Sequence, residues 1–149
     1  MLRNVIESPK VVEIYTVSED VKRGQLVSKN LATKTAGKAN DEGVQVHIVD
    51  FDAQTSGDLS DVYVSQYDAS MDTVKANSQA VLVTYGVGGQ FATDQTTGTF
   101  TDGKYAVAAD GLFSPAAAGK VSKFKYVGEY LDGDKVLKQF QVVDPVTVA

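Results

Sequence analysis

The chain has 149 residues, 43% hydrophobic and 22% charged, which is typical of a globular domain with a substantial core, and the absence of cysteine excludes disulfides and thiolate metal sites. The net charge of −5 is uneven, with +3 on residues 1–38, −9 on residues 39–110 and +1 on residues 111–149. This acidic middle argues against nucleic-acid binding; it either serves solubility or lets the basic N-terminal end and the acidic body meet different partner surfaces.

Residues 1–9 are predicted to form an extended N-terminal arm. Leu2, Val5 and Ile6 precede Pro9, which favours an extended conformation before it. Such a terminus is either frayed or paired with a strand elsewhere. The arm lacks the apolar core of a signal peptide, and no apolar run in the chain approaches the length of a membrane span. We therefore expect no secretion by that route and no membrane partner.

The first half of the chain reads as strands separated by polar turns. Lys10–Val17 is rich in β-branched and aromatic residues, so a strand is predicted there. Residues 21–27 predict short extended pieces with a tight bend at Gly24. Residues 30–43 predict a loop or an irregular hairpin, and residues 44–51 predict a strand with alternating apolar residues.

The middle of the chain contains the one plausible helix. Residues 52–60 predict a polar turn, and residues 61–67 alternate as a strand does. Residues 69–79 predict a helix of at most two or three turns, capped by Ser70. Residues 80–85 are apolar on both faces, which is typical of a strand that is covered on both sides.

The last third contains three Asp-Gly turn signals. They lie at residues 102–103, 110–111 and 132–133, after a Gly- and Thr-rich stretch whose large apolar anchor is Phe91. The third signal lies inside residues 123–143, which alternate with a period of two and predict a hairpin. We expect this hairpin to be central, with Phe124, Tyr126 and Phe140 buried, and with a bulge at Gly128.

These patterns together predict a mainly β protein. We expect a small β-barrel or β-sandwich with antiparallel hairpins and at most one short helix. The predicted organisation is an arm at residues 1–9 followed by a single β domain at residues 10–149.

One acidic stretch has the spacing of a calcium-binding loop. Its oxygen-bearing residues fall at the usual ligand positions: Asp50, Asp52, Gln54, Ser56, Asp58 and Asp61. Thr55 stands where glycine is required, and Asp61 is shorter than the usual bidentate glutamate. We therefore interpret the stretch as an acidic surface loop, with calcium as the alternative, and predict no metal site and no cofactor.

Two further features lack the context that catalysis or nucleotide binding requires. His47 is the one histidine, and we interpret it as a surface or interface strand residue because no oriented partner is indicated. Residues 86–89 form a glycine cluster after a strand, but no Lys-Ser or Lys-Thr and no helix follow, so a flexible loop or bulge is predicted. The hydroxyls and carboxylates also lack a partnered base. We expect no catalytic residues and no enzymatic activity.

Two windows of the sequence resemble the small head-decoration (capsid cement) proteins of tailed bacteriophages. The first is Val-Lys-Arg-Gly-Gln-Leu-Val at residues 21–27, followed by Gly-Lys-Ala at residues 37–39. The second is Asp-Gly-Leu-Phe at residues 110–113, followed by Gly-Lys at residues 119–120 and Tyr-Val-Gly-Glu-Tyr at residues 126–130. The matching segments are short, and the acidic middle of the chain is not part of them.

The resemblance implies a structural role on the virus particle. Such proteins bind the outer surface of the expanded head, often as trimers, and strengthen it, so the expected partner is the major capsid protein and the expected location is the virion exterior after synthesis in the bacterial host cytoplasm. In some of them an N-terminal arm joins a strand of the capsid protein. The corresponding residues here are Leu2, Arg3, Val5 and Ile6. The alternatives are another virion component of the tail, neck or head fibre, and a free-standing β module that binds a ligand.

Overall fold

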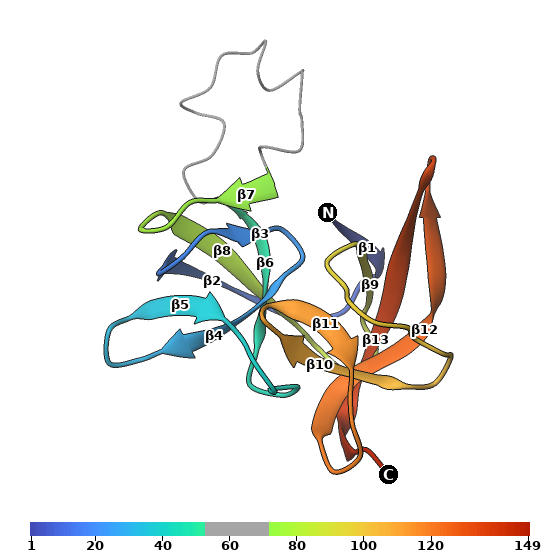
Figure 1. Cartoon of the computed structure of the whole chain (residues 1–149). Helices are drawn as coiled ribbons and strands as arrows, with labels where there is room; N and C mark the ends of the chain where they lie inside the picture. The colour runs from blue at the N-terminus through green and yellow to red at the C-terminus, as the bar shows by residue number, and fades with distance from the viewer. Residues whose placement is uncertain (53–71) are drawn as a thin grey trace.

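The computed structural model describes residues 1–52 and 72–149, and almost all of its regular structure is β (Figure 1). Its strands are β1 (Leu2–Ile6), β2 (Lys10–Val17), β3 (Val21–Lys22), β4 (Leu26–Asn30), β5 (Thr35–Lys38), β6 (His47–Asp52), β7 (Thr73–Val74), β8 (Gln79–Tyr85), β9 (Gln90–Thr93), β10 (Tyr105–Ala109), β11 (Leu112–Pro115), β12 (Val121–Asp132) and β13 (Lys135–Thr147). The predicted turn at residues 52–60 and the predicted strand at residues 61–67 lie outside the described residues, apart from residue 52, which ends β6.

The strands form a closed barrel and an open sheet, with one small ribbon. The barrel has the order β2-β5-β4-β6-β8, the six-stranded sheet has the order β1-β9-β13-β12-β10-β11, and β3 pairs with β7. Neighbouring strands are antiparallel except β2 and β5, which are parallel. The prediction of a mainly β protein with antiparallel hairpins and a barrel or sandwich is confirmed.

The helix predicted at residues 69–79 is wrong over the part that the structure describes. Thr73 and Val74 form β7, which pairs with β3, and the chain turns at Asn77 with a φ of +67° before β8 begins. Thr73 and Val74 are β-branched and favour the extended conformation once a partner strand is present.

No helix among the described residues is long and apolar enough to cross a membrane.

Strand β8 joins the two halves of the core. It lies between β2 and β6 in the barrel, and its alternate residues enter two different apolar clusters. Ala80 and Leu82 belong to the cluster inside the barrel, whereas Val83 and Tyr85 belong to the cluster between the barrel and the six-stranded sheet. The prediction that residues 80–85 are covered on both faces is therefore confirmed.

The core between the barrel and the sheet is built from aromatic rings. Phe91, Phe113, Phe124 and Phe140 are all buried, and they come from β9, β11, β12 and β13. The ring centroids of Phe113 and Phe140 are 4.7 Å apart, and those of Phe91 and Phe140 are 5.9 Å apart. Phe140 is in ring contact with four aromatic side chains of this cluster, which are Phe91, Phe100, Phe113 and, at 5.8 Å, Tyr126.

The predicted hairpin at residues 123–143 is confirmed as β12 and β13. Phe124, Tyr126 and Phe140 are buried, and the ladder shifts its register between Tyr126 and Gly128, where the bulge was predicted. Gly128 has a φ of +133°, which L side chains rarely adopt. Near the turn the core-facing positions of β13 change, because Leu137 is buried and Val136 is exposed.

The shorter turns also follow the sequence. Asp110 and Gly111 both have positive φ values, of 49° and 80°, and connect β10 to β11 as a two-residue hairpin. Residues 30–43 contain the second strand of an irregular hairpin, β5. The predicted bend at Gly24 has a φ of +93°, and a Cβ atom there would lie 2.3 Å from the Thr93 Oγ1 atom, so a side chain has no room.

Replacing Phe140 with alanine should lower the free energy of unfolding by about 3 to 5 kcal/mol, because a fully buried ring would be exchanged for a cavity. Chemical denaturation measures the change. The exposed Val87 provides the control, since Val87→Ala should leave the unfolding midpoint unchanged. Equal midpoints for both variants would show that the hairpin is peripheral to the core.

Candidate binding surface

The predicted N-terminal arm is part of the six-stranded sheet. Residues 2–6 form β1, which pairs in antiparallel fashion with β9 and lies at the edge of the sheet. Of the four residues assigned to capsid binding, Leu2 is 2% exposed and belongs to the apolar core. Arg3 and Val5 are partly buried, and Ile6 is exposed. The first residues thus have a strand partner within their own chain, which is one of the two states expected for them.

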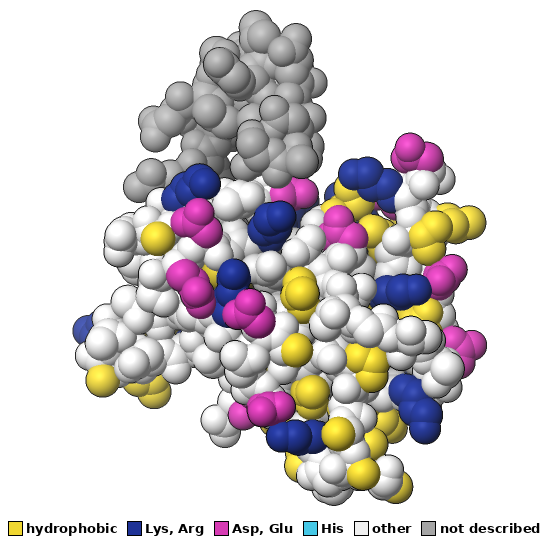
Figure 2. Space-filling model, in the orientation of Figure 1, with side chains coloured by type: hydrophobic (Ala, Val, Ile, Leu, Met, Phe, Trp, Pro, Cys, Tyr) yellow, Lys and Arg dark blue, Asp and Glu magenta, His cyan; other side chains and the backbone are white. Residues whose placement is uncertain are grey.

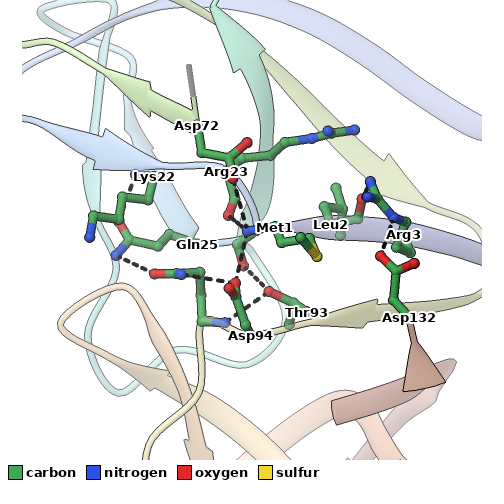
Figure 3. Close-up of polar contacts among 12 residues, drawn as sticks. Met1, Leu2, Arg3, Lys22, Arg23, Gln25, Asp72, Thr93, Asp94 and Asp132 are labelled. Atoms are coloured by element: carbon green, nitrogen blue, oxygen red, sulfur yellow. Dashed lines mark hydrogen bonds and ion pairs between the residues drawn. The ribbon is translucent and has the colours of Figure 1, made fainter. Parts of the chain in front are cut away.

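The N-terminal ammonium group is held by a polar network (Figure 3). It donates hydrogen bonds to Asp94 Oδ1 at 2.8 Å and to the Arg23 carbonyl oxygen at 3.1 Å, and it lies 3.7 Å from Asp72 Oδ2. Burial raises the pKa of Asp94, but hydrogen bonds from the ammonium group and from Gln95 outweigh this effect and hold the pKa below its ordinary value of 3.8. The chain terminus is therefore an ionic anchor between β9 and the bend after β3.

A second set of contacts supports this anchor. Gln95 donates to the Asp94 carboxylate at 2.9 Å, and the buried Gln25 donates to the Gln95 side-chain oxygen at 3.2 Å. Farther along β1, the Tyr85 hydroxyl donates to Asn4 Oδ1 at 2.5 Å. These bonds connect the edge of the six-stranded sheet to the barrel, so they fix β1 in position.

An ion pair joins β1 to the end of the β12–β13 hairpin. Arg3 Nε lies 2.8 Å from Asp132 Oδ2 (Figure 3). Next to Asp132, Leu131 is paired with Val136 across the ladder, and these side chains are 72% and 50% exposed. We call Arg3, Leu131, Asp132 and Val136 the hairpin-end surface. Figure 2 shows hydrophobic side chains beside charged ones in this part of the molecule, at the upper right.

A polar cluster was missed in the sequence. His47 is half-buried, and its Nδ1 atom lies 2.6 Å from Thr84 Oγ1, so it has the side-chain partner that was not expected. Lys29 forms an ion pair with Glu13, and its Nζ atom lies 4.9 Å from the centre of the Tyr15 ring. The alternation of side chains along the strands could have indicated this cluster. Its residues lie on the same strand faces as the valines and the leucine inside the barrel.

The cluster favours the neutral form of the imidazole. Burial lowers the pKa of His47 below its ordinary value of 6.5, and the charge of Lys29 lowers it further, whereas Glu13 acts in the opposite direction. The imidazole contacts the Thr84 hydroxyl, and both side chains lie on the strand faces that line the barrel interior. His47 thus has a hydrogen-bonding partner for its half-buried ring, and we interpret it as a structural residue.

The calcium-like stretch falls mostly outside the described residues, which include Asp50 and the backbone of residue 52. Asp50 Oδ1 forms an ion pair with Arg23 Nη2 at a distance of 3.1 Å. Within residues 1–52 and 72–149, no three histidine or acidic side chains come together as metal ligands would. The acidic surface loop predicted at residues 50–61, and calcium binding as its alternative, therefore stay predictions.

The glycine cluster at residues 86–89 is a tight connection between the barrel and the sheet. The Gly86 amide donates to the Pro9 carbonyl oxygen at 2.8 Å, and the Gly88 amide donates to the Val142 carbonyl oxygen at 2.8 Å. A Cβ atom at Gly89 would lie 2.3 Å from Ser8 Oγ. The glycines serve close backbone packing, and these amides already have partners within the chain.

Comparison with known proteins adds no assignment. No protein-family model matches the chain, and no curated protein matches its sequence.

Replacing Asp94 with asparagine should lower the free energy of unfolding at pH 7 by about 1 kcal/mol, because a partly exposed ion pair with the terminus is lost. The pKa of Asp94 is lowered in the folded state, so its contribution is present above pH 3.8 and is lost as the pH falls through the folded-state value. Urea denaturation at pH 7 and at pH 3 measures both effects. Asp144→Asn, at an exposed site, is the control; a difference from wild type that persists unchanged at low pH would contradict the anchor.

Replacing His47 with glutamine should flatten the pH dependence of stability between pH 7 and pH 5. The unfolded chain binds a proton near pH 6.5 and the folded chain only at lower pH, so wild-type stability falls as the pH drops below 6.5. Glutamine keeps a hydrogen-bonding group near Thr84 but does not titrate. Thermal melting across this range gives the two slopes, and parallel slopes would show that His47 is as solvated when folded as when unfolded.

Proposed function

We propose that this chain is a head-decoration (cement) protein of a tailed bacteriophage. It binds the outer surface of the expanded capsid, contacts the major capsid protein and stabilises the shell without catalysing a reaction. The proposal combines one structural observation, the hairpin-end surface, with the resemblance of five short segments to this class, at residues 21–27, 37–39, 110–113, 119–120 and 126–130.

The hairpin-end surface supports the proposal because it presents apolar side chains on a supported frame. Leu131 and Val136 are exposed at the end of the longest hairpin, while the base of the same hairpin contributes Phe124 and Phe140 to the core. The ion pair between Arg3 and Asp132 holds the hairpin end against β1. A protein that bridges subunits benefits from such preorganisation, because little side-chain and backbone entropy is lost on binding.

The roles of the N-terminal residues are refined by their burial. Leu2 is enclosed in the core, so its contribution to capsid binding is indirect, through the position of β1. Arg3, Val5 and Ile6 are accessible to different degrees and remain the direct contacts proposed on this strand. Together with the exposed residues at the hairpin end, they are the contacts that we propose for the capsid, with apolar side chains and charged groups as in many protein interfaces.

The mechanism of stabilisation is mass action on the assembled shell. A ligand that binds only the intact lattice shifts the equilibrium away from disassembly. The composite surface between capsid subunits exists only after assembly, so binding to unassembled capsid protein is expected to be weak. Rim charges such as Arg3 steer the encounter, so binding should weaken as the ionic strength rises.

The test is titration of bare expanded shells with the purified protein. Binding should saturate at a fixed copy number per shell and should raise the temperature at which shells release DNA. The double variant Leu131→Asp and Val136→Asp should weaken binding by about 10-fold or more, since two apolar contacts are exchanged for charges. Leu31→Asp is the matched control, because Leu31 is equally exposed but lies in the connection between β4 and β5.

Two outcomes would overturn parts of the proposal. Intact expanded shells that neither bind the protein nor gain stability from it would exclude decoration, and antibody labelling at the neck or tail of particles would then assign the alternative virion role. Normal binding by the double variant would retain decoration but place the contact away from the hairpin end.

A further inference from the structure

Strand β2 has one paired edge and one largely open edge. Along one side it pairs with β8 from Lys10 to Thr16. Along the other side it pairs with β5 only at Thr16 and Val17. Residues 10–15 therefore have no strand partner on that side within the described part of the chain. Open edges of this kind are templates for the addition of another strand.

The hydrogen bonds of β2 show which residues face the open edge. The Val17 amide donates to the Ser78 carbonyl oxygen at 2.9 Å, and the Pro9 carbonyl oxygen accepts a bond from the Gly86 amide at 2.8 Å, so odd-numbered residues bond toward β8. The Ser18 amide donates to the Ala36 carbonyl oxygen of β5 at 2.9 Å. Because bonding alternates along an antiparallel strand, the even-numbered residues 10, 12 and 14 direct their amides and carbonyls toward the open edge.

The side chains at the same positions form an apolar surface. Val12 is 54% exposed and Ile14 is 59% exposed. In the ladder with β8 they lie opposite Val83 and Val81, which are buried. The exposed pair is thus the rim of an apolar strip that continues into the core. An edge with both free hydrogen-bonding groups and exposed valine and isoleucine fits an extended strand as its ligand.

We propose that the occupant of this edge is β2 of a second copy of this chain, in antiparallel pairing with Val12 opposite Val12 of the partner copy. In this register Lys10 lies opposite Ile14, so residues 10, 12 and 14 of both copies all find partners. The outer face then brings the two Val12 side chains together, and each Ile14 side chain lies diagonal to Val12 of the other copy. The barrel strands β8 and β2 continue into the same two strands of the other copy as one sheet.

Neighbouring registers are less favourable. A shift of one pair in one direction places Glu13 opposite Glu13 of the other copy, and like charges directly opposite destabilise a ladder. It also requires Thr16, which already pairs with β5. A shift in the other direction leaves Ile14 opposite Ser8, which lies before the strand begins. The register centred on Val12 places Glu13 opposite Val11 and avoids both conflicts.

The assembly is a dimer with two-fold symmetry. The same edge is used by both copies, so the contact is isologous and closes at two subunits. The contact is small, so we expect a dimer that dissociates at micromolar concentrations. The inference is independent of capsid binding, because the hairpin-end surface and the open edge of β2 share no residue.

The test uses the absence of native cysteine in the chain. A hydrogen-bonded antiparallel pair has Cα atoms about 5.5 Å apart, within the range of a disulfide, so Val12→Cys should form a covalent dimer under mild oxidation. Ile14→Cys is the matched control: it is equally exposed, but its own symmetry mate lies four residues away along the ladder, so it should remain largely monomeric. Non-reducing electrophoresis gives the two yields.

Sedimentation and hydrogen exchange of the unmodified full chain complete the test. The sedimentation coefficient should rise from monomer to dimer between about 1 and 100 μM, and Val12→Lys should raise the dissociation constant by about 10-fold or more. The amides of Val12 and Ile14 should exchange more slowly as the dimer forms, while that of Glu13 should be protected at every concentration. A monomer at all concentrations, a trimer, or equal cross-linking of Ile14→Cys and Val12→Cys would overturn the proposal.

Discussion

The constraint on which the structure depends is the burial of β8 on both faces. A strand of this kind cannot lie at the surface, because its Leu82 side and its Val83 side each require a separate apolar layer. The barrel supplies the first layer by closing around Leu82. The six-stranded sheet supplies the second with the aromatic side chains of β9, β11, β12 and β13. The barrel and the six-stranded sheet are therefore held together by β8, which is buried on both faces, and by the apolar core between them. The long β12–β13 hairpin is the main contributor to that core.

Whether a strand edge is held by other parts of the chain or left uncovered then determines which surfaces are available to partners. The edge at β1 is fixed by the N-terminal ammonium group, by Asp94 and by the hydrogen bond between Tyr85 and Asn4. This anchoring positions Arg3 to hold the end of the hairpin. The edge at β2 has no such covering from the described residues, and it exposes Val12 and Ile14. One edge thus supports the proposed capsid contact, and the other is suited to self-association.

Local sequence signals were reliable where the physical cause was local. The Asp-Gly turns, the bend at Gly24 and the bulge at Gly128 each depend on a backbone conformation that few residues adopt, so they could be read directly. The helix at residues 69–79 failed because Thr73 and Val74 found a partner strand in β3, and no local pattern reports a partner that is distant in sequence. The side-chain partner of His47 was not predicted for a similar reason, since Thr84 is on another strand.

The sequence by itself determined the β class, the position of most strands and the burial of Phe124, Tyr126 and Phe140, because alternation and turn chemistry act over a few neighbouring residues. Only the tertiary structure decided the pairing of those strands. It placed Leu2 in the core instead of on a free arm, brought Arg3 to Asp132 across the molecule, and left one edge of β2 open. These features depend on which distant strands meet, and a ladder between distant strands is selected by the packing of the whole core.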